Sequence, residues 1–327
     1  MLNPTKNWTL VRRILLVIAC IPLLMFLMVV ANLLWNSRLA LSFGLPVLFS
    51  DKISTALSAK WIPGQFGLLP AIVGTIQVVI LSLLFSLPFS LVLALAASEY
   101  SLGWLSRPIE LLMSIFNGIP DILYALMSVF VVTAFIRPKF AAIDLDDSLI
   151  RTLPGLPPYS STMLPLNQST LLGAIFLALL IIPFMAPLIL DSIRNVPQSQ
   201  REASISLGAT RWFTLQRIIL PGAMPGIIGA ISLGVLKAAG DVIICAWTIG
   251  FIKDNGLPNP LWDFFERNAP LTATGTGLVG GLFGATPVMG PGFSAANFAA
   301  LLLLVFAFAV LGLAGLMRRW LNRRYKA

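Results

Sequence analysis

The chain has 327 residues, of which 57% are hydrophobic and only 11% are charged, and its mean hydropathy is +0.90. A soluble domain carries about 25% charged residues, so the composition excludes an ordinary soluble protein and indicates a polytopic membrane protein. Lys and Arg outnumber Asp and Glu by 22 to 13, and they cluster beside apolar segments, which favours membrane topology over a nucleic-acid surface. With no histidine and two cysteines in different apolar segments, the chain offers neither a histidine-based triad nor a metal site.

Six apolar segments are long enough to cross a membrane, because a transmembrane helix needs about 20 mostly apolar residues. We therefore predict an all-α fold with about six transmembrane helices in a single transmembrane domain, 1–327. The first segment lacks a small-residue cleavage site and reads as an uncleaved signal anchor. The third is interrupted by the sequence Gly-Ile-Pro-Asp. The predicted spans are about 14–34, 69–97, 109–135, 169–190, 216–251 and 297–317.

A polar stretch, 197–221, separates the fourth and fifth spans and carries helix signals. Ser199 and Glu202 have the spacing of a capping box, and Gly208 is placed to end a short helix in the left-handed conformation. A second short helix is predicted over 211–220, ended by the following proline. Two short helices meeting at a glycine would form a compact knob that docks into another protein. The knob would carry three arginines out of the bilayer: Arg201, Arg211 and Arg217.

The same stretch resembles the EAA loop of ABC-importer permeases. That loop reads E-A-A, three residues, G, nine residues and I-x-L-P, and here every spacing matches, with Ser204 in place of the second alanine. The resemblance implies that 197–221 is the coupling helix that sits in a cleft of a cytoplasmic ATPase subunit. A capped amphipathic loop of some other membrane protein is the alternative. The coupling residues expected from the resemblance are Arg201, Glu202, Ala203, Gly208 and Arg211.

The distribution of Lys and Arg predicts the orientation of the chain. Six spans place both termini on one side, together with the turn at 98–108 and the knob, and this side holds the larger share of the basic residues. Basic residues are retained in the cytoplasm, so we expect both termini and the knob to be cytoplasmic in a bacterial inner membrane.

Three ionisable residues are predicted within the membrane: Lys237 and Asp241 in the fifth span and Asp121 in the third. Charge in hydrocarbon is costly and points to function. Lys237 and Asp241 are four apart, so one interpretation is a self-neutralising structural pair on one helical face near mid-membrane. The other is that Lys237 supplies positive potential to an anion, with Asp241 holding it in place. Asp121 either lines the same cavity or caps the half-helix that follows Pro120.

A narrower resemblance is to the phosphate-uptake permeases, and it rests on three segments: LPFSLVLALAASEY, RPIELLMSIFNGIPDILYALMSVF and LKAAGD. In that subtype the last segment reads R-A-x-G-E, so Lys237 and Asp241 occupy its arginine and glutamate positions with charge kept. Asp121 departs from the serine usual after G-I-P. Lysine also cannot form arginine's bidentate fork to an oxyanion, so the substrate implied is phosphate or a related inorganic oxyanion.

The resemblance also implies a set of partners. They are a second permease subunit in a hetero- or homodimer, two cytoplasmic ATPase subunits and an extracytoplasmic substrate-binding protein, all assembled in the lipid bilayer. The chain has no P-loop, so we expect no enzyme activity and no cofactor of its own, with ATP bound by the partner subunits. A G-x-G-x-x-G match at 275–280 has no preceding strand and is not expected to bind a nucleotide.

Three alternative functions remain at this point. The chain could be an ABC permease for another small solute. It could be a self-sufficient secondary transporter that uses Lys237, Asp121 and Asp241 as coupling groups and needs no ATPase. It could also be a non-transporting membrane scaffold, which would tolerate neutralising Lys237 and Asp241.

Overall fold

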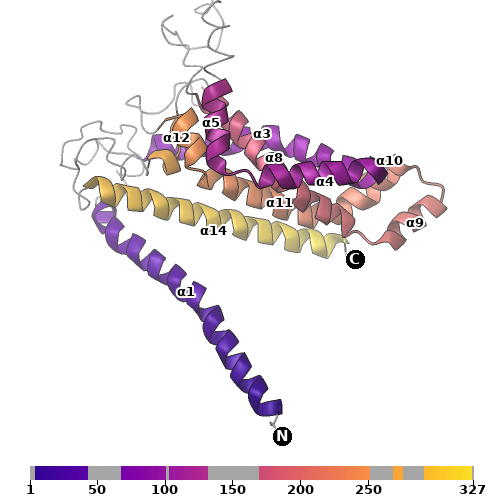
Figure 1. Ribbon diagram of the computed structural model, residues 1–327, viewed down its shortest axis with the longest axis horizontal. Helices are drawn as coiled ribbons and strands as arrows, with labels where there is room; N and C mark the ends of the chain where they lie inside the picture. Colours follow the sequence, from indigo (N-terminus) through magenta and orange to yellow (C-terminus); the bar gives the residue numbers. More distant parts are fainter. Residues whose placement is uncertain are drawn as a thin grey trace, which may run out of the picture.

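The computed structural model describes residues 4–42, 68–100, 103–131, 169–250, 268–274 and 291–325, and these residues are helical wherever they form regular structure. Five helices are long and apolar enough to cross a membrane, and a bent pair of shorter helices is a sixth candidate. Figure 1 shows most of them as one elongated bundle. The long helices are α1 (Pro4–Ser42), α3 (Leu69–Leu95), α8 (Thr170–Arg194), α11 (Leu220–Gly240) and α14 (Pro291–Tyr325).

Helix α8 is the centre of the bundle and packs against α3 and α11. Its inward face is a stripe of large apolar side chains at intervals of four residues, which places them one above the other on one side of a helix. All five are fully buried: Leu177, Ile181, Met185, Ile189 and Ile193. Burying one such side chain contributes about 1.5–3 kcal/mol, so this stripe is a major source of the bundle's packing energy.

Glycine lets α11 approach α8 closely. A Cβ atom at Gly226 would lie 2.3 Å from the Oγ of Ser192 on α8, so a larger residue would force the helices apart. Gly222 and Gly226 have the Gly-x-x-x-Gly spacing that permits close approach of two helices. A second motif of this kind, at 280–284, lies outside the described residues, as does the G-x-G-x-x-G match.

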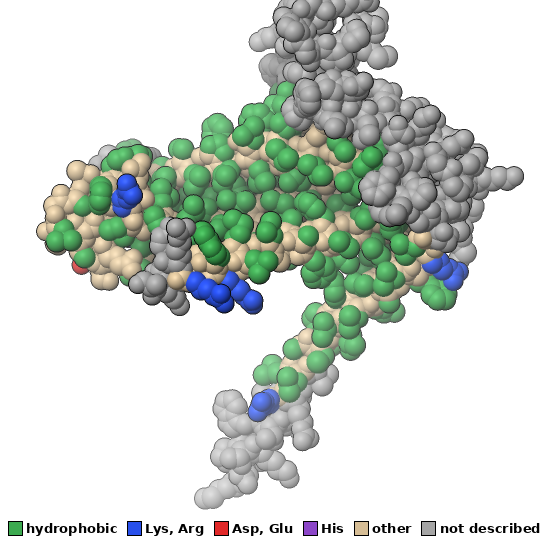
Figure 2. All heavy atoms as spheres, turned by 180° about the vertical axis from the view of Figure 1, so that it is seen from behind, with side chains coloured by type: hydrophobic (Ala, Val, Ile, Leu, Met, Phe, Trp, Pro, Cys, Tyr) green, Lys and Arg blue, Asp and Glu red, His purple; other side chains and the backbone are tan. Residues whose placement is uncertain are grey.

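The first and last long helices pack against each other at the edge of the bundle, and α1 then diverges from it (Figure 1). Ser294 on α14 accepts a hydrogen bond from the backbone N–H of Ala40, and the rings of Phe26 and Phe308 meet edge to face at 6.1 Å. Figure 2 shows hydrophobic side chains covering the flank of the bundle, with Lys and Arg near the end that carries α9 and the C-terminus, at the opposite end, and on the protruding helix α1. This is the surface expected of a protein surrounded by lipid.

The third predicted span is a sharply bent pair, α4 (Gly103–Asn117) and α5 (Asp121–Val131), which meet at 91°. Pro120 prevents a continuous helix because it cannot donate a backbone hydrogen bond. The Tyr124 hydroxyl donates to the Phe116 carbonyl at 2.8 Å and satisfies an oxygen that the helix end leaves free. The sequence therefore predicted the interruption but not the right-angle turn.

The fifth predicted span, 216–251, differs from the structure at both ends. A helical segment runs without a break from α10 (Arg211–Thr214) through the π turn η3 (Leu215–Ile219) into α11, so Pro221 does not end it. Proline is tolerated in the first turn of α11, because its missing N–H is not needed there. The helix ends at Gly240 instead of near residue 251, and a separate short helix follows, α12 (Ile243–Thr248).

Candidate functional site

The knob predicted at 197–221 is present at one end of the bundle. Helix α9 (Gln198–Ser206) is followed by its C-cap residue Leu207 and then by Gly208, whose φ of +83° confirms the predicted left-handed conformation. The N–H of Ala209 donates to the carbonyl of Ser204, and that of Gly208 donates to the carbonyl of Ile205. These two bonds form a Schellman motif, which glycine favours because it has no Cβ atom.

The predicted capping box is wrong. Helix α9 begins at Gln198 with Pro197 as its N-cap residue, so Ser199 already lies inside the first turn. Glu202 instead accepts a hydrogen bond from the Gln198 side chain at 3.2 Å. The cap that sequence reasoning missed is Thr210, whose Oγ1 accepts from the N–H of Phe213 at 3.2 Å. A threonine just before a helical run was the available signal.

Ser204, the one departure from the E-A-A pattern, has a structural role. Its hydroxyl lies 2.8 Å from the Oγ1 of Thr214, and both side chains are buried. The bond joins α9 to α10, so α9 is held against the segment that continues into α11. A buried hydrogen bond between two hydroxyls satisfies both, where alanine at position 204 would leave Thr214 with one partner fewer.

The outer surface of the knob is apolar and exposed. Leu207 at its tip is 89% exposed, and a cavity of about 780 Å³ lies between α9 and α10. Ala203 and Gly208 line this cavity, while Glu202 and Arg211 are exposed. Exposed apolar patches outside the membrane mark interaction surfaces. The remaining exposed apolar side chains of the patch are Ile205, Trp212 and Phe213.

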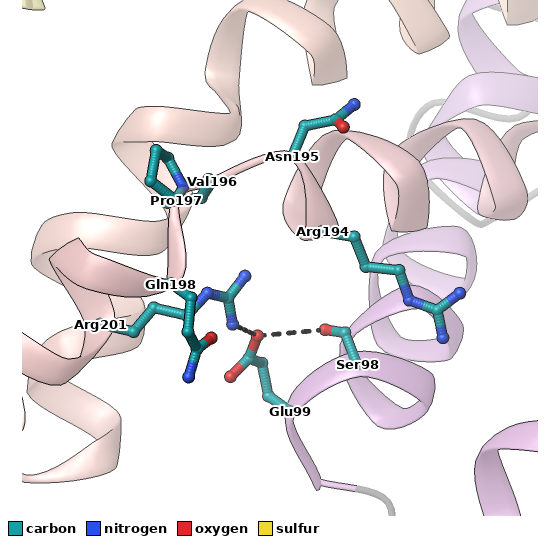
Figure 3. A pocket seen from close by; sticks show the side chains of 8 residues that line it. All are labelled: Ser98, Glu99, Arg194, Asn195, Val196, Pro197, Gln198 and Arg201. Carbon is teal, nitrogen blue, oxygen red and sulfur yellow. Dashed lines mark hydrogen bonds and ion pairs between the residues drawn. The ribbon is translucent and has the colours of Figure 1, made fainter.

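Arg201 points in the opposite direction, toward the bundle. Its Nη1 forms an ion pair with Glu99 of the π turn η1 (Ala96–Tyr100), and its Nη2 donates to the Ile193 carbonyl at 2.7 Å. Figure 3 shows the two side chains meeting at the edge of a cavity of about 400 Å³. Of the predicted coupling residues, Arg201 is thus the one that faces the transmembrane helices.

At the other end of the bundle, Lys237 pairs with Asp121. The Nζ of Lys237 lies 3.0 and 3.2 Å from the two carboxylate oxygens of Asp121. Lys237 is in the last turn of α11 and Asp121 in the first turn of α5, so each charge also complements its helix dipole. The two side chains are 31% and 36% exposed, which makes this a partly accessible ion pair.

Asp241 was predicted to share a helical face with Lys237, but it does not. Helix α11 ends at Gly240, and the backbone of Asp241 is extended. Its buried carboxylate accepts a hydrogen bond from the N–H of Ile244 at 2.8 Å, at the start of α12. Thr272 donates to its backbone carbonyl at 2.9 Å. Among the described residues, the ion pair of Lys237 is with Asp121 and not with Asp241.

The mid-membrane position expected for Lys237 stays a prediction. Lys237 lies in the last turn of α11, 20 residues after Arg217, which is about 30 Å along a helix at 1.5 Å per residue.

Within the part of the chain that the structure describes, no cluster of three or more Cys, Asp or Glu could hold a metal ion. An ammonium group has three donors, and Lys237 directs its hydrogen bonds at the two oxygens of one carboxylate. An oxyanion presents the same kind of acceptor to an ammonium group.

Comparison with known proteins places the chain in a family. The family described as "Binding-protein-dependent transport system inner membrane component" matches residues 86–327. The phosphate transport system permease protein PstC of Haemophilus influenzae is 29% identical over 231 residues, which cover 70% of this chain and 72% of that protein. PstC of Xylella fastidiosa (strain Temecula1) is 29% identical over 224 residues, covering 67% of this chain and 65% of the relative. The probable ABC transporter permease protein YqgH of Bacillus subtilis is 28% identical over 197 residues, which cover 59% of this chain and 57% of that protein.

Solved structures share the fold. A chain of a bacterial alginate ABC transporter, solved with a periplasmic protein bound to an alginate pentasaccharide, matches with a TM-score of 0.61 and 18% identity, covering 98% of this chain and 96% of that one. A chain of the inward-facing MetNI methionine ABC transporter matches with a TM-score of 0.51 and 16% identity, covering 78% and 94%. The chain therefore belongs to the inner-membrane components of binding-protein-dependent transport systems, as a multi-pass permease whose ATPase is a separate subunit.

Proposed function

We propose that this chain forms the translocation path of an ATP-driven importer for phosphate or a related inorganic oxyanion. The observation that carries the proposal is the partly exposed Lys237–Asp121 pair. The relatives named as phosphate permeases support the same substrate class. An anion entering a low-dielectric passage needs a fixed positive charge, and Lys237 provides one where α11 and α5 meet.

In this proposal the oxyanion displaces Asp121 from Lys237. Lysine suits such an exchange because its ammonium is a compact charge with rotatable donors, whereas arginine would hold a carboxylate in a bidentate fork. Asp241 serves the site indirectly by fixing the break between α11 and α12 through Ile244. The helices α4 to α12, joined in one permease domain with α1, α3 and α14, would then surround the path.

The proposed partners are two ATPase subunits on the cytoplasmic side, an extracytoplasmic binding protein, and a second permease that is either a copy of this chain or a similar one. The ATPase would receive Leu207 and the apolar patch around it. The proposed cytoplasmic placement of the knob and both termini is supported by arginines at the end of the bundle that carries α9. Three of these arginines lie near the end of α14: Arg318, Arg319 and Arg323.

Reconstitution of the complete complex in liposomes tests the function. Radiolabelled phosphate should accumulate only when the binding protein and ATP are both present, and arsenate should compete better than the sulfate dianion. Accumulation by this chain alone in an ion gradient would instead identify a secondary transporter. ATP-dependent activity that no oxyanion inhibits would assign the importer to another solute.

A further inference from the structure

A charged contact joins the coupling helix α9 to two transmembrane helices at once. The guanidinium of Arg201 pairs with Glu99, which lies at the end of α3, and it also donates to the Ile193 carbonyl in the last turns of α8. The side chains of Arg201 and Glu99 are only 15% and 21% exposed. One side chain on α9 therefore contacts α8 and the π turn η1 that continues α3.

The chemistry of the contact favours a stiff connection. A guanidinium is planar and directs its donors at fixed angles, so one group can hold two acceptors in a defined geometry. Hydrogen bonds between charged groups are about twice as strong as neutral ones, and they gain further where water is excluded. Glu99 also lies in a π turn, a distortion that is rare in helices and is frequently found at functional sites.

A second ion pair beside the same cavity provides a contrast. Arg194 on α8 pairs with Glu110 on α4 at 2.5 Å, but these side chains are 45% and 38% exposed. Exposed pairs contribute about 0–1 kcal/mol, because water screens the charges and the side chains lose entropy. The Arg194–Glu110 pair joins α8 to α4, whereas the Arg201–Glu99 pair involves α9. The first pair is therefore a matched control for the second.

We propose that Arg201 and Glu99 are positioning residues that make α9 move as one rigid unit with the adjoining ends of α3 and α8. The proposal rests on the assignment of α9 as the helix that receives the ATPase. On its other side, α9 is joined to α10 by the bond between Ser204 and Thr214. A displacement of α9 then reaches α3, α8 and α11 together, without a flexible step.

The first test separates coupling from stability in the assembled complex. With Glu99→Gln or Arg201→Gln, the complex should assemble and hydrolyse ATP, but the stimulation of hydrolysis by the binding protein should fall roughly tenfold, within the usual range of coupling effects. The control Glu110→Gln should leave this stimulation unchanged. The exchange Glu99→Arg with Arg201→Glu should restore part of it. A proportional loss of assembly and basal hydrolysis, with stimulation kept, would show that the pair only stabilises the fold.

The second test asks whether the pair stays closed during transport. Cysteines replace Glu99 and Arg201 in a chain whose Cys20 and Cys245 are changed to alanine, and a short bis-maleimide joins them. Before joining, this variant lacks the ion pair and should show the loss of stimulation expected of Glu99→Gln. A rigid unit predicts that joining restores the stimulated hydrolysis and the uptake of inorganic phosphate. Failure of joining to restore either would overturn the proposal, because α9 would then have to separate from α3. Stimulated hydrolysis without phosphate uptake, in the unmodified complex as well, would refute the phosphate assignment and leave the coupling result valid.

Discussion

Lys237 and Asp121 are 116 residues apart in the sequence, yet the lysine Nζ lies 3.0 Å from a carboxylate oxygen of the aspartate. The right-angle bend between α4 and α5 brings Asp121 to this place, and the end of α11 at Gly240 presents Lys237 to it. The pair thus exists because α11 ends where α5 begins. Both ends direct their dipoles and their charges at the same point.

The partial exposure of this pair predicts a small structural cost when it is broken. Because the side chains are 31% and 36% exposed, Lys237→Leu or Asp121→Leu should change the free energy of unfolding by about 1 kcal/mol or less, not the 3–5 kcal/mol typical of a buried pair. Thermal unfolding in detergent measures this difference. The double variant should be as stable as either single variant, and a marked loss of yield in the single variants alone would indicate a buried structural pair.

Gly208 is predicted to be required for its backbone conformation. No atom lies within 4 Å of a Cβ built at this position, so a side chain there has space, but at a φ of +83° it costs about 1–2 kcal/mol. Gly208→Val should therefore insert normally yet lose ATPase binding and transport. Gly208→Asn should keep most of both, since asparagine tolerates the left-handed region. Gly229 on α11 also has open space but lies in a regular helix, so Gly229→Ala is the control and should behave as wild type.

Leu207 is predicted to be an anchor for the ATPase. Its side chain is 89% exposed on a surface that lies outside the apolar flank of the bundle, so docking would remove it from water. Leu207→Asp should abolish co-purification of the ATPase subunit without lowering the amount of inserted permease. Leu207→Met keeps the apolar surface and should preserve binding. Equal co-purification by all three proteins would move the interface elsewhere.

The orientation of the bundle can be checked by cysteine labelling in intact cells. In a chain without native cysteines, Leu41→Cys at the end of α1 should react with an impermeant maleimide, because this exposed residue is predicted to face outward. Arg319→Cys near the end of α14 should react only after the cells are opened. The reversed labelling pattern would place both termini and the knob outside.

The sequence was most informative where a local rule decides the structure. The positive φ of Gly208 follows from the residue type, and the break at Pro120 follows from its missing donor. The sequence was not sufficient where the structure depends on contacts between distant segments. No local sequence pattern predicts that Lys237 pairs with Asp121, because the pairing requires the bend between α4 and α5 and the early end of α11.

Two other residues show the same limit in different ways. Arg201 was expected to couple to the ATPase, but its partner Glu99 lies about a hundred positions earlier and becomes a neighbour only after α3 packs on α8. Pro221 was expected to stop a helix, but it lies in the first turn of α11, where its missing N–H is tolerated. The surroundings of Arg201 were supplied by the tertiary structure, whereas the outcome at Pro221 depends on where α11 begins.

The role of Lys237 is the central claim, and phosphate uptake by the Lys237→Ala complex tests it most directly. Initial rates are measured in liposomes that hold the complete complex, beside Lys237→Arg and a wild-type control, after each complex has been shown to assemble and to hydrolyse ATP. The account predicts that Lys237→Ala abolishes uptake, while Lys237→Arg keeps a measurable part of it, because a positive charge remains beside the path. Uptake by Lys237→Ala at close to the wild-type rate would contradict the account and make the pair with Asp121 purely structural.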